Sequence, residues 1–141
     1  MLLYGNYYYV TMSYAPIPER VNHLSSIIFD CALTIHRKLG PGLLENIYEE
    51  CLVYELRSRG LKIESQVSLP IVYQELKIEN AYRIDILVED SIIIEIKAVE
   101  AIQPVHEAQL LTYLRLTNHR LGLLINFNSP LIKDGIRRMA N

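Results

Sequence analysis

Two aliphatic segments, separated by three residues, limit most strongly what this chain can fold into. They span residues 83–88 and 92–97 and read RIDILV and IIIEIK. Side chains alternate across a β-strand, so residues at alternate positions share a face. The even positions are all aliphatic, namely Ile84, Ile86, Val88, Ile92, Ile94 and Ile96. The segments therefore predict a tight hairpin with an aliphatic face and its charges on the other face.

The charged face of this hairpin predicts a reactive site. With Glu89-Asp90-Ser91 as a three-residue loop, Asp85 lies opposite Glu95, and Arg83 lies opposite Lys97. Two facing carboxylates in an apolar hairpin repel, so that one of them should protonate unless a divalent cation lies between them. Lys97 projects to the same side as Glu95. An acid pair such as Asp85 and Glu95 with an adjacent lysine, here Lys97, is typical of a metal-dependent site that cleaves phosphodiesters.

The alternative is that these charges only mark the solvated face of an exposed strand. The run Ile92 to Ile94, followed by Ile96, is instead typical of a central strand that is covered on both sides. Charges inside such a strand are costly unless they are paired or bound to a metal. The apolar context therefore favours the site.

Composition limits the class of protein. The chain has 141 residues, which suits one domain, and its formal net charge of -2 provides no overall basic field, although a local basic patch would suffice for nucleic acid. Cys31 and Cys51 lie in apolar helical patterns and lack C-x-x-C spacing. They are therefore expected to be small core residues in a reducing compartment, and not a disulfide or a zinc site. No stretch is apolar enough to span a membrane, and the first ten residues lack a basic leader. We expect a cytoplasmic protein with no membrane partner.

The first 22 residues look unlike the rest. Tyr7-Tyr8-Tyr9 and Ala15-Pro16-Ile17-Pro18 show neither helical nor strand periodicity, so residues 1–22 are expected to form a short arm or a disordered tail. Met12 is an alternative start of translation. Residues 23–141 contain no internal repeat or linker and are expected to form a single domain.

Apolar periodicity predicts the order of elements in that domain. A first helix should run from Asn22 or Ser25 to Leu39, with a buried stripe of Ile28, Cys31, Ala32, Ile35 and Leu39. After Gly40-Pro41-Gly42, a second helix should reach about Arg59, with a buried stripe of Leu44, Ile47, Tyr48, Cys51 and Leu52. Strands should cover residues 61–69 and 71–78, broken by Pro70 and by a polar turn near Gln74-Glu75.

The remaining elements complete an α/β domain. A third helix should span residues 104–116, and residues 121–127 should form a strand that returns parallel to the Glu95 strand. A short C-terminal helix should bury Leu131, Ile132, Ile136 and Met139 and expose Lys133 and Arg137. This order predicts a mixed central β-sheet flanked by helices.

Two helices carry further candidate residues. His106, Gln109 and Tyr113 fall on one face of the third helix, where Gln109 and Tyr113 could contact phosphates or bases, or could be polar cover on a surface helix. Glu45 lies three residues before Tyr48 on the second helix, where glutamate is ordinarily a capping or dipole residue.

Several short motifs together resemble a known family. Residues 42–48 match G-x-x-E-x-x-Y, and further likeness lies in residues 82–89, 95–100, 106–114 and 122–127. In these segments the chain resembles the GxxExxY proteins, which are placed in the PD-(D/E)xK nuclease superfamily. The likeness covers about Leu24 to Met139 and leaves out only the N-terminal arm.

The resemblance implies a restriction-endonuclease-like core and a set of roles. Asp85 and Glu95 would ligate a metal ion, Lys97 would be the catalytic lysine, and Glu45 would complete the metal shell. Gln109 and Tyr113 match the Q-x-x-x-Y helix motif, which lies against nucleic acid in exonuclease-like members.

Two hypotheses follow. The first is a nuclease that uses Mg²⁺ or Mn²⁺, because hard oxygen ligands favour these ions, with the Ile96 carbonyl as a further ligand and a metal-bound water as nucleophile. DNA is favoured over RNA. Because the chain is small and has no second recognition domain, it is expected to act on nucleic-acid structure or ends, or to rely on a protein partner or a homodimer. The second is a non-catalytic module that binds nucleic acid or protein and retains the nuclease fold.

Overall fold

The computed structural model describes residues 2–4, 7–9 and 15–141. Its elements are β1 (Leu2–Tyr4), β2 (Tyr7–Tyr9), α1 (Glu19–Leu39), α2 (Glu45–Ser58), β3 (Ile63–Tyr73), β4 (Leu76–Val88), β5 (Ile92–Lys97), α3 (Pro104–Thr117), β6 (Leu121–Asn126), the 3₁₀ helix η1 (Ile132–Gly135) and β7 (Ile136–Ala140). The expected arm differs in two ways: β1 and β2 pair as an antiparallel hairpin, and α1 begins within the arm. Met12 lies outside the described residues.

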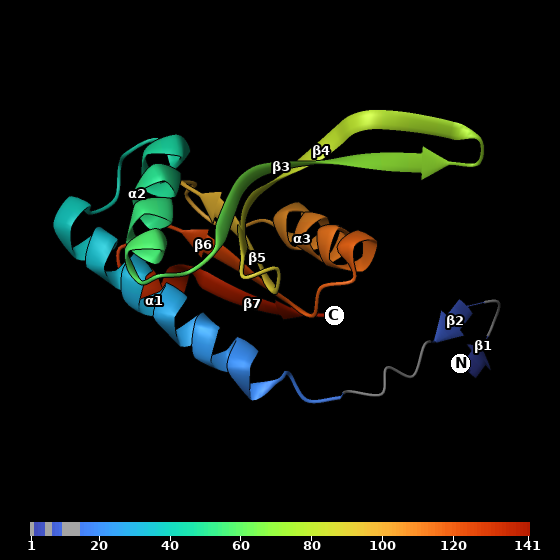
Figure 1. Ribbon diagram of the computed structural model, residues 1–141, viewed down its shortest axis with the longest axis horizontal. Helices are drawn as coiled ribbons and strands as arrows, with labels where there is room; N and C mark the ends of the chain where they lie inside the picture. The colour runs from blue at the N-terminus through green and yellow to red at the C-terminus, as the bar shows by residue number, and fades with distance from the viewer. Residues whose placement is uncertain (1, 5–6, 10–14) are drawn as a thin grey trace.

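The central sheet is mixed and has five strands in the order β3-β4-β5-β6-β7. β5 and β6 are parallel, and the other neighbours are antiparallel. The α3 crossover joins the parallel pair, as the sequence predicted. Helices cover both faces, so the predicted α/β class is confirmed (Figure 1).

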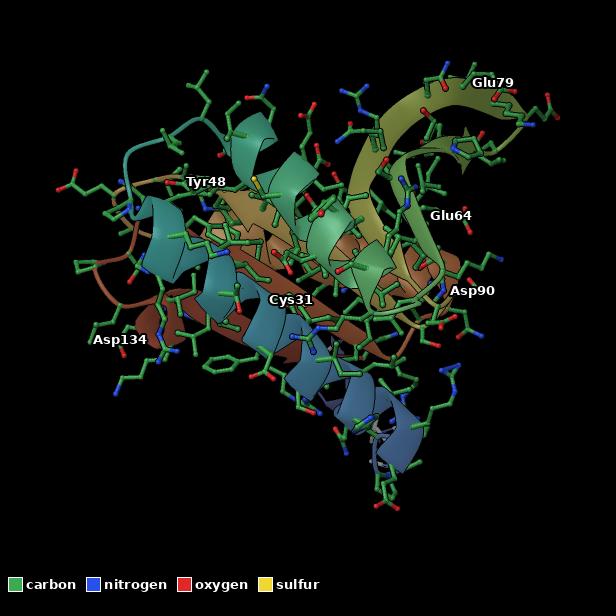
Figure 2. All side chains as sticks on the ribbon, turned by 60° about the vertical axis from the view of Figure 1, so that its left-hand side comes forward. Cys31, Tyr48, Glu64, Glu79, Asp90 and Asp134 are labelled. Atoms are coloured by element: carbon green, nitrogen blue, oxygen red, sulfur yellow. The ribbon has the colours of Figure 1, made fainter. Side chains whose placement is uncertain are left out.

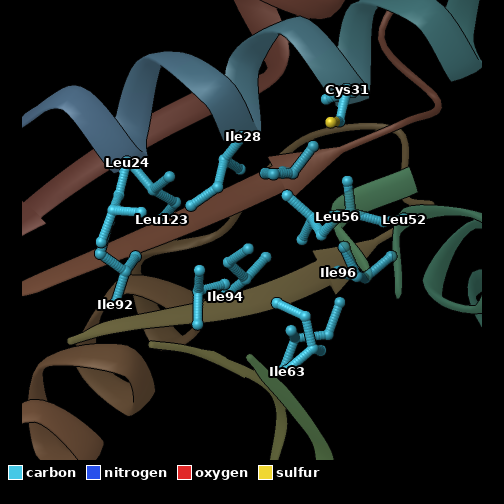
Figure 3. Packing of buried hydrophobic residues seen from close by; sticks show 14 of the residues in the cluster. Leu24, Ile28, Cys31, Leu52, Leu56, Ile63, Ile92, Ile94, Ile96 and Leu123 are labelled. Atoms are coloured by element: carbon cyan, nitrogen blue, oxygen red, sulfur yellow. The ribbon is translucent and has the colours of Figure 1, made fainter. Parts of the chain in front are cut away.

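Two hydrophobic cores lie on opposite faces of the sheet. The larger one packs α1 and α2 against the sheet, and Figure 3 shows Leu24, Ile28 and Cys31 of α1 lying over Ile92, Ile94 and Leu123. The smaller one packs α3 against the other face through Leu110, Tyr113 and Leu114. β5 is thus covered on both sides, which agrees with its aliphatic run.

The buried stripes of the first two helices differ in part from those predicted. Leu39 ends α1 and is 43% exposed, and Leu44 precedes α2 and is 73% exposed. Because α2 begins only at Glu45, its buried face consists of Tyr48, Leu52 and Leu56, four residues apart, and Ile47 is left largely exposed.

β3 and β4 form a long two-stranded ribbon that extends beyond the rest of the sheet (Figure 1). The prediction that Pro70 breaks the strand was wrong: β3 runs through it, with a shift of register between Leu69 and Ile71. Proline is tolerated at such irregularities because no ladder hydrogen bond is required from it. The polar turn lies where it was predicted, and Figure 2 shows Glu64 near the base of the ribbon and Glu79 near its far end.

The predicted C-terminal helix was wrong. A 3₁₀ turn leads into β7, which pairs antiparallel with β6 and completes the sheet. Ile136 packs against the larger core and Met139 against the smaller one, so they lie on opposite faces of the sheet, and Leu131 is 55% exposed. Without β7, the backbone N–H and C=O groups along one edge of β6 would have no hydrogen-bond partners. Pairing with them stabilises residues 136–140 as a strand more than their weak helical spacing stabilises a helix.

None of the helices in the described ranges is long and apolar enough to cross a membrane.

Candidate active site

The β4–β5 hairpin has the predicted register only near its turn. Val88 pairs with Ile92, Leu87 with Ile93 and Ile86 with Ile94, around the three-residue loop. Beyond Ile86 the regular ladder gives way to side-chain bonds, so the predicted pairing of Arg83 with Lys97 was wrong.

Asp85 and Glu95 lie together at this point, as the sequence predicted. The Asp85 backbone N–H donates to Glu95 Oε1 at 3.2 Å. The Ile96 backbone N–H donates to Asp85 Oδ2 at 2.9 Å. Each carboxylate thus accepts a main-chain N–H from the other strand, where the regular ladder has ended.

The other side of β4 is also irregular at Asp85. The β3–β4 ladder pairs Ser65 with Ile86 and Val67 with Ile84, and skips Gln66 and Asp85. Gln66 has a φ of 55°, a left-handed conformation that is uncommon for this residue type.

At this irregularity β4 turns over, which means that the even-numbered residues before and after Asp85 lie on opposite faces of the sheet. Ile84 lies in the smaller, α3-side core, whereas Ile86 and Val88 lie in the larger core. The prediction that all three share a face was therefore wrong, because it assumed strict alternation through Asp85. The turn-over frees the Asp85 backbone from the ladder on both sides.

Glu95 is a buried acid. It is 4% exposed and lies between Ile94 and Ile96 on the central strand. Burial, the adjacent Asp85 charge and a hydrogen bond between the two carboxyl groups raise the pKa of Glu95 to about 9, although the Asp85 backbone bond and the Lys97 charge act in the opposite direction. At neutral pH the pair of carboxyl groups therefore retains a proton. A cation bound beside Asp85 and Glu95 would be stabilised by their negative charge.

Lys97 ends β5 within electrostatic reach of Glu95. Its side chain is half-buried and takes part in no hydrogen bond or salt bridge among the described side chains. The chain that follows is fixed by Asn126, which is 4% exposed and exchanges two hydrogen bonds with the Val99 backbone, at 3.1 and 2.9 Å. Sequence analysis missed Asn126, although a polar residue ending an apolar strand was a usable signal.

Tyr48 fixes the turn that presents Glu45. Its hydroxyl donates to the Gly40 carbonyl at 2.6 Å and accepts from the Leu43 N–H at 3.1 Å. Its ring stacks on Phe127 with centroids 4.5 Å apart, and Figure 2 shows it near the start of α2. Glu45 Oε1 in turn accepts a hydrogen bond from the Ala98 N–H at 3.2 Å, which joins α2 to the end of β5.

A cleft of about 330 Å³ opens between α2 and the base of the ribbon. Its lining residues come from α2, β3, β4 and β5, and they are Glu45, Asn46, Glu49, Gln66, Arg83, Asp85 and Ile96. Burial, first, and the Asp85 charge raise the pKa of Glu49, whose carboxylate accepts a hydrogen bond from the Gln66 side chain. Sequence analysis missed both residues. Glu49 could have been found one helical turn after Glu45, but nothing in the sequence reveals the Gln66 conformation.

The donor set of the acid pair suits a hard divalent cation. Asp85 and Glu95 offer carboxylate oxygens, and Ile96 adjoins them, contributing its N–H to Asp85. Within the described ranges, however, no three His, Cys, Asp or Glu side chains lie close enough together to hold one ion. Glu45 is therefore near the pair but is not drawn into one ligand sphere with it.

The α3 candidates fall into different environments. Tyr113 is 4% exposed and stacks on Tyr82 with centroids 5.0 Å apart. Burial, together with the charges of Glu95 and Asp85, raises the pKa of Tyr113 to about 12. Gln109 is exposed, and His106 Nδ1 accepts the Gln103 N–H at 2.9 Å at the start of the helix. Tyr113 is thus a core residue within electrostatic reach of the acid pair, whereas Gln109 is open to solvent.

Comparison with known proteins places the chain in a family. A sequence model described as the PD-(D/E)XK nuclease superfamily matches residues 22–139. The chain belongs to the PD-(D/E)XK nuclease superfamily. No curated protein and no solved structure matches it. The five-stranded mixed sheet flanked by helices agrees with this PD-(D/E)XK membership, and Glu95-Ile96-Lys97 reads as the (D/E)xK part of the superfamily name.

Proposed function

We propose that this PD-(D/E)XK protein is a Mg²⁺- or Mn²⁺-dependent nuclease of the GxxExxY group that hydrolyses phosphodiester bonds, with DNA favoured over RNA. The observation that carries the proposal is the contact between Asp85 and Glu95: the buried Glu95 carboxylate accepts the Asp85 backbone N–H, and the Asp85 carboxylate, which lines the cleft, accepts the N–H of Ile96. Burying one acid beside a second carboxylate is unfavourable for folding unless a proton or a cation compensates the charge.

Each residue of the acid pair has a role in this proposal. Asp85 and Glu95 would hold the cation, with the Ile96 carbonyl as a further ligand. Glu45, which lines the same cleft but lies outside a common ligand sphere, would complete the shell by moving toward the bound cation. A bound Mg²⁺ or Mn²⁺ supplies a water of lowered pKa and neutralises charge on the phosphate. Glu95 is itself 4% exposed, so bulk water has little access to its carboxylate.

Lys97 would stabilise the charge that builds up on the phosphate during cleavage. Its ammonium group lies near Glu95 and makes no hydrogen bond or salt bridge with a described side chain, so its donors are available. His106, Gln109 and Tyr113 are proposed to lie beside the nucleic acid, Gln109 by direct contact because it is exposed. We further propose that the protein acts in the cytoplasm, and that a partner protein or a second copy contributes to substrate recognition.

A cleavage assay tests the proposal. Labelled single-stranded, double-stranded and branched DNA and RNA are incubated with the protein in Mg²⁺, in Mn²⁺ and in a chelator. We expect cleavage of at least one substrate that stops on chelation and is lost in Asp85→Asn, which keeps the side-chain shape but removes the charge.

Calorimetry provides the matched measurement. Wild type should bind Mg²⁺ or Mn²⁺, and Asp85→Asn should not, whereas Asp90→Asn, in the exposed hairpin loop, should bind as wild type does. Cation binding by Asp85→Asn at wild-type affinity would remove Asp85 from the site. Nucleic-acid binding without cleavage under every condition would favour the non-catalytic binding module.

A further inference from the structure

Arg83 is the one basic residue among the described residues that line the cleft between α2 and the ribbon. Three acids, Glu45, Glu49 and Asp85, line the same cleft. An arginine among carboxylates usually forms paired hydrogen bonds with one of them. Arg83 is instead exposed, and it takes part in none of the salt bridges or side-chain hydrogen bonds formed among the described side chains. Its guanidinium donors are therefore available to a ligand.

The irregularity at Asp85 explains why Arg83 faces this cleft. Arg83 pairs through its backbone with Ser68 on β3, two residues before Asp85 on β4. Its neighbour Ile84 is turned into the α3-side core, so Arg83 projects to the opposite side of the ribbon, where α2 lies. Arg83 and Asp85 thus line one cavity, because the change of side comes only at Asp85, before Ile86.

The electrostatic balance of the cleft indicates the ligand. Three carboxylates and one guanidinium leave an excess of negative charge, which repels a phosphate except where a cation is added. Arg83 supplies a fixed positive charge at the rim, and a guanidinium matches two oxygens of a phosphate group. On the α3 side of the sheet Tyr113 is buried, so its side chain offers little surface to a substrate.

We propose that Arg83 binds a backbone phosphate of the nucleic acid, next to the phosphate that is cleaved, and that the substrate strand reaches Asp85 through the cleft between α2 and the ribbon. This inference rests on the proposed nuclease function and specifies where its substrate lies. The contact proposed for Gln109 on α3 would involve another part of the same nucleic acid.

Fluorescence anisotropy with a labelled DNA duplex, its single strand and a forked duplex tests the inference, with Ca²⁺ as the cation. We expect Arg83→Gln to weaken binding about tenfold or more, because a hydrogen bond to a charged group is lost. The slope of log affinity against log salt concentration should fall by about one, since one fewer phosphate is neutralised. Arg83→Lys should restore most of the slope.

Arg59→Gln is the matched control. Arg59 follows the last residue of α2, at the opposite end of the helix from Glu45, and the substitution changes the net charge equally. We expect wild-type affinity and slope from this control. The thermal unfolding midpoint and calorimetric cation affinity of Arg83→Gln should also equal those of wild type.

The outcomes separate this inference from the nuclease proposal. If Arg83→Gln binds DNA with the same affinity and salt slope as Arg59→Gln, the role of Arg83 is overturned. The nuclease proposal still stands in that case if the wild-type protein cleaves a substrate. If Arg83→Gln lowers the unfolding midpoint but leaves the salt dependence of binding unchanged, Arg83 is a structural counter-charge, and its proposed contact with phosphate is overturned. A wild-type protein that binds none of the probes would overturn both.

Discussion

The Asp85 backbone nitrogen lies 3.2 Å from Glu95 Oε1, so the second acid of the site accepts a hydrogen bond from the main chain of the first. In return, Asp85 Oδ2 accepts the N–H of Ile96, the residue after Glu95. The two strands are therefore joined by the carboxyl groups themselves. A change in either side chain alters the local pairing of the sheet as well as the charge of the site.

The raised pKa of Glu95 predicts a pH-dependent stability without added metal. Between its ordinary value and about 9, the folded protein holds a proton on Glu95 that the unfolded chain has released, so this group destabilises the fold increasingly as pH rises. Glu95→Gln should remove a slope of at most about 1.4 kcal/mol per pH unit. Urea unfolding at pH 5 and pH 8 should therefore show a larger gain in stability at pH 8. An equal gain at both pH values would contradict the raised pKa.

Lys97→Ala should separate catalysis from folding. The Lys97 side chain makes no hydrogen bond or salt bridge among the described side chains, so thermal unfolding and cation affinity should change little. Cleavage should fall by a factor of about 10² or more, which is typical of losing one electrostatic stabiliser. The rate is measured in single turnover with Mg²⁺ or Mn²⁺. Unchanged cleavage would remove Lys97 from the mechanism, and an unfolded variant would make it a structural counter-charge.

Tyr48→Phe should lower stability through the turn before α2. The substitution removes a hydroxyl that bonds to both Gly40 and Leu43, and the part-buried carbonyl and N–H lose this partner. We expect a loss of about 1 kcal/mol or more in the free energy of unfolding. Tyr54→Phe, at a side chain that is 73% exposed, is the control and should change it by about 0.5 kcal/mol or less. Equal effects at the two sites would show that the Tyr48 hydroxyl contributes nothing.

Gln109 and Tyr113 should respond differently to replacement by alanine. Tyr113 is buried between α3 and the sheet and stacks on Tyr82, so Tyr113→Ala should cost about 3–5 kcal/mol of stability in urea unfolding. Gln109 is exposed, so Gln109→Ala should fold as wild type does and can test contact with nucleic acid by itself. Wild-type stability in Tyr113→Ala would contradict the packing described here. Wild-type anisotropy in Gln109→Ala would remove α3 from the substrate surface.

The sequence predicted the hairpin well because its two determinants are local. The length of the loop fixes the register, and the aliphatic run identifies a central strand, so the meeting of Asp85 and Glu95 followed directly. The parallel return of β6 followed from the helix between the two strands.

The turn-over of β4 could not be predicted in the same way. It depends on the left-handed backbone of Gln66 on the neighbouring strand, a residue type that gives no sign of that conformation. The C-terminal strand was missed for another reason. In a segment as short as Ile136–Ala140, the helical and strand periods cannot be distinguished, and the pairing with β6 decides.

The order in which the site assembles follows from the chain positions of its parts. Asp85 and Glu95 come from strands joined by a three-residue turn, so bringing them together closes a very short loop. Glu45 reaches Ala98 only across a separation of 53 residues. The entropic cost of closing a loop rises with its length. We therefore expect the acid pair to form with the hairpin early in folding, and the α2 wall of the cleft to close over it later.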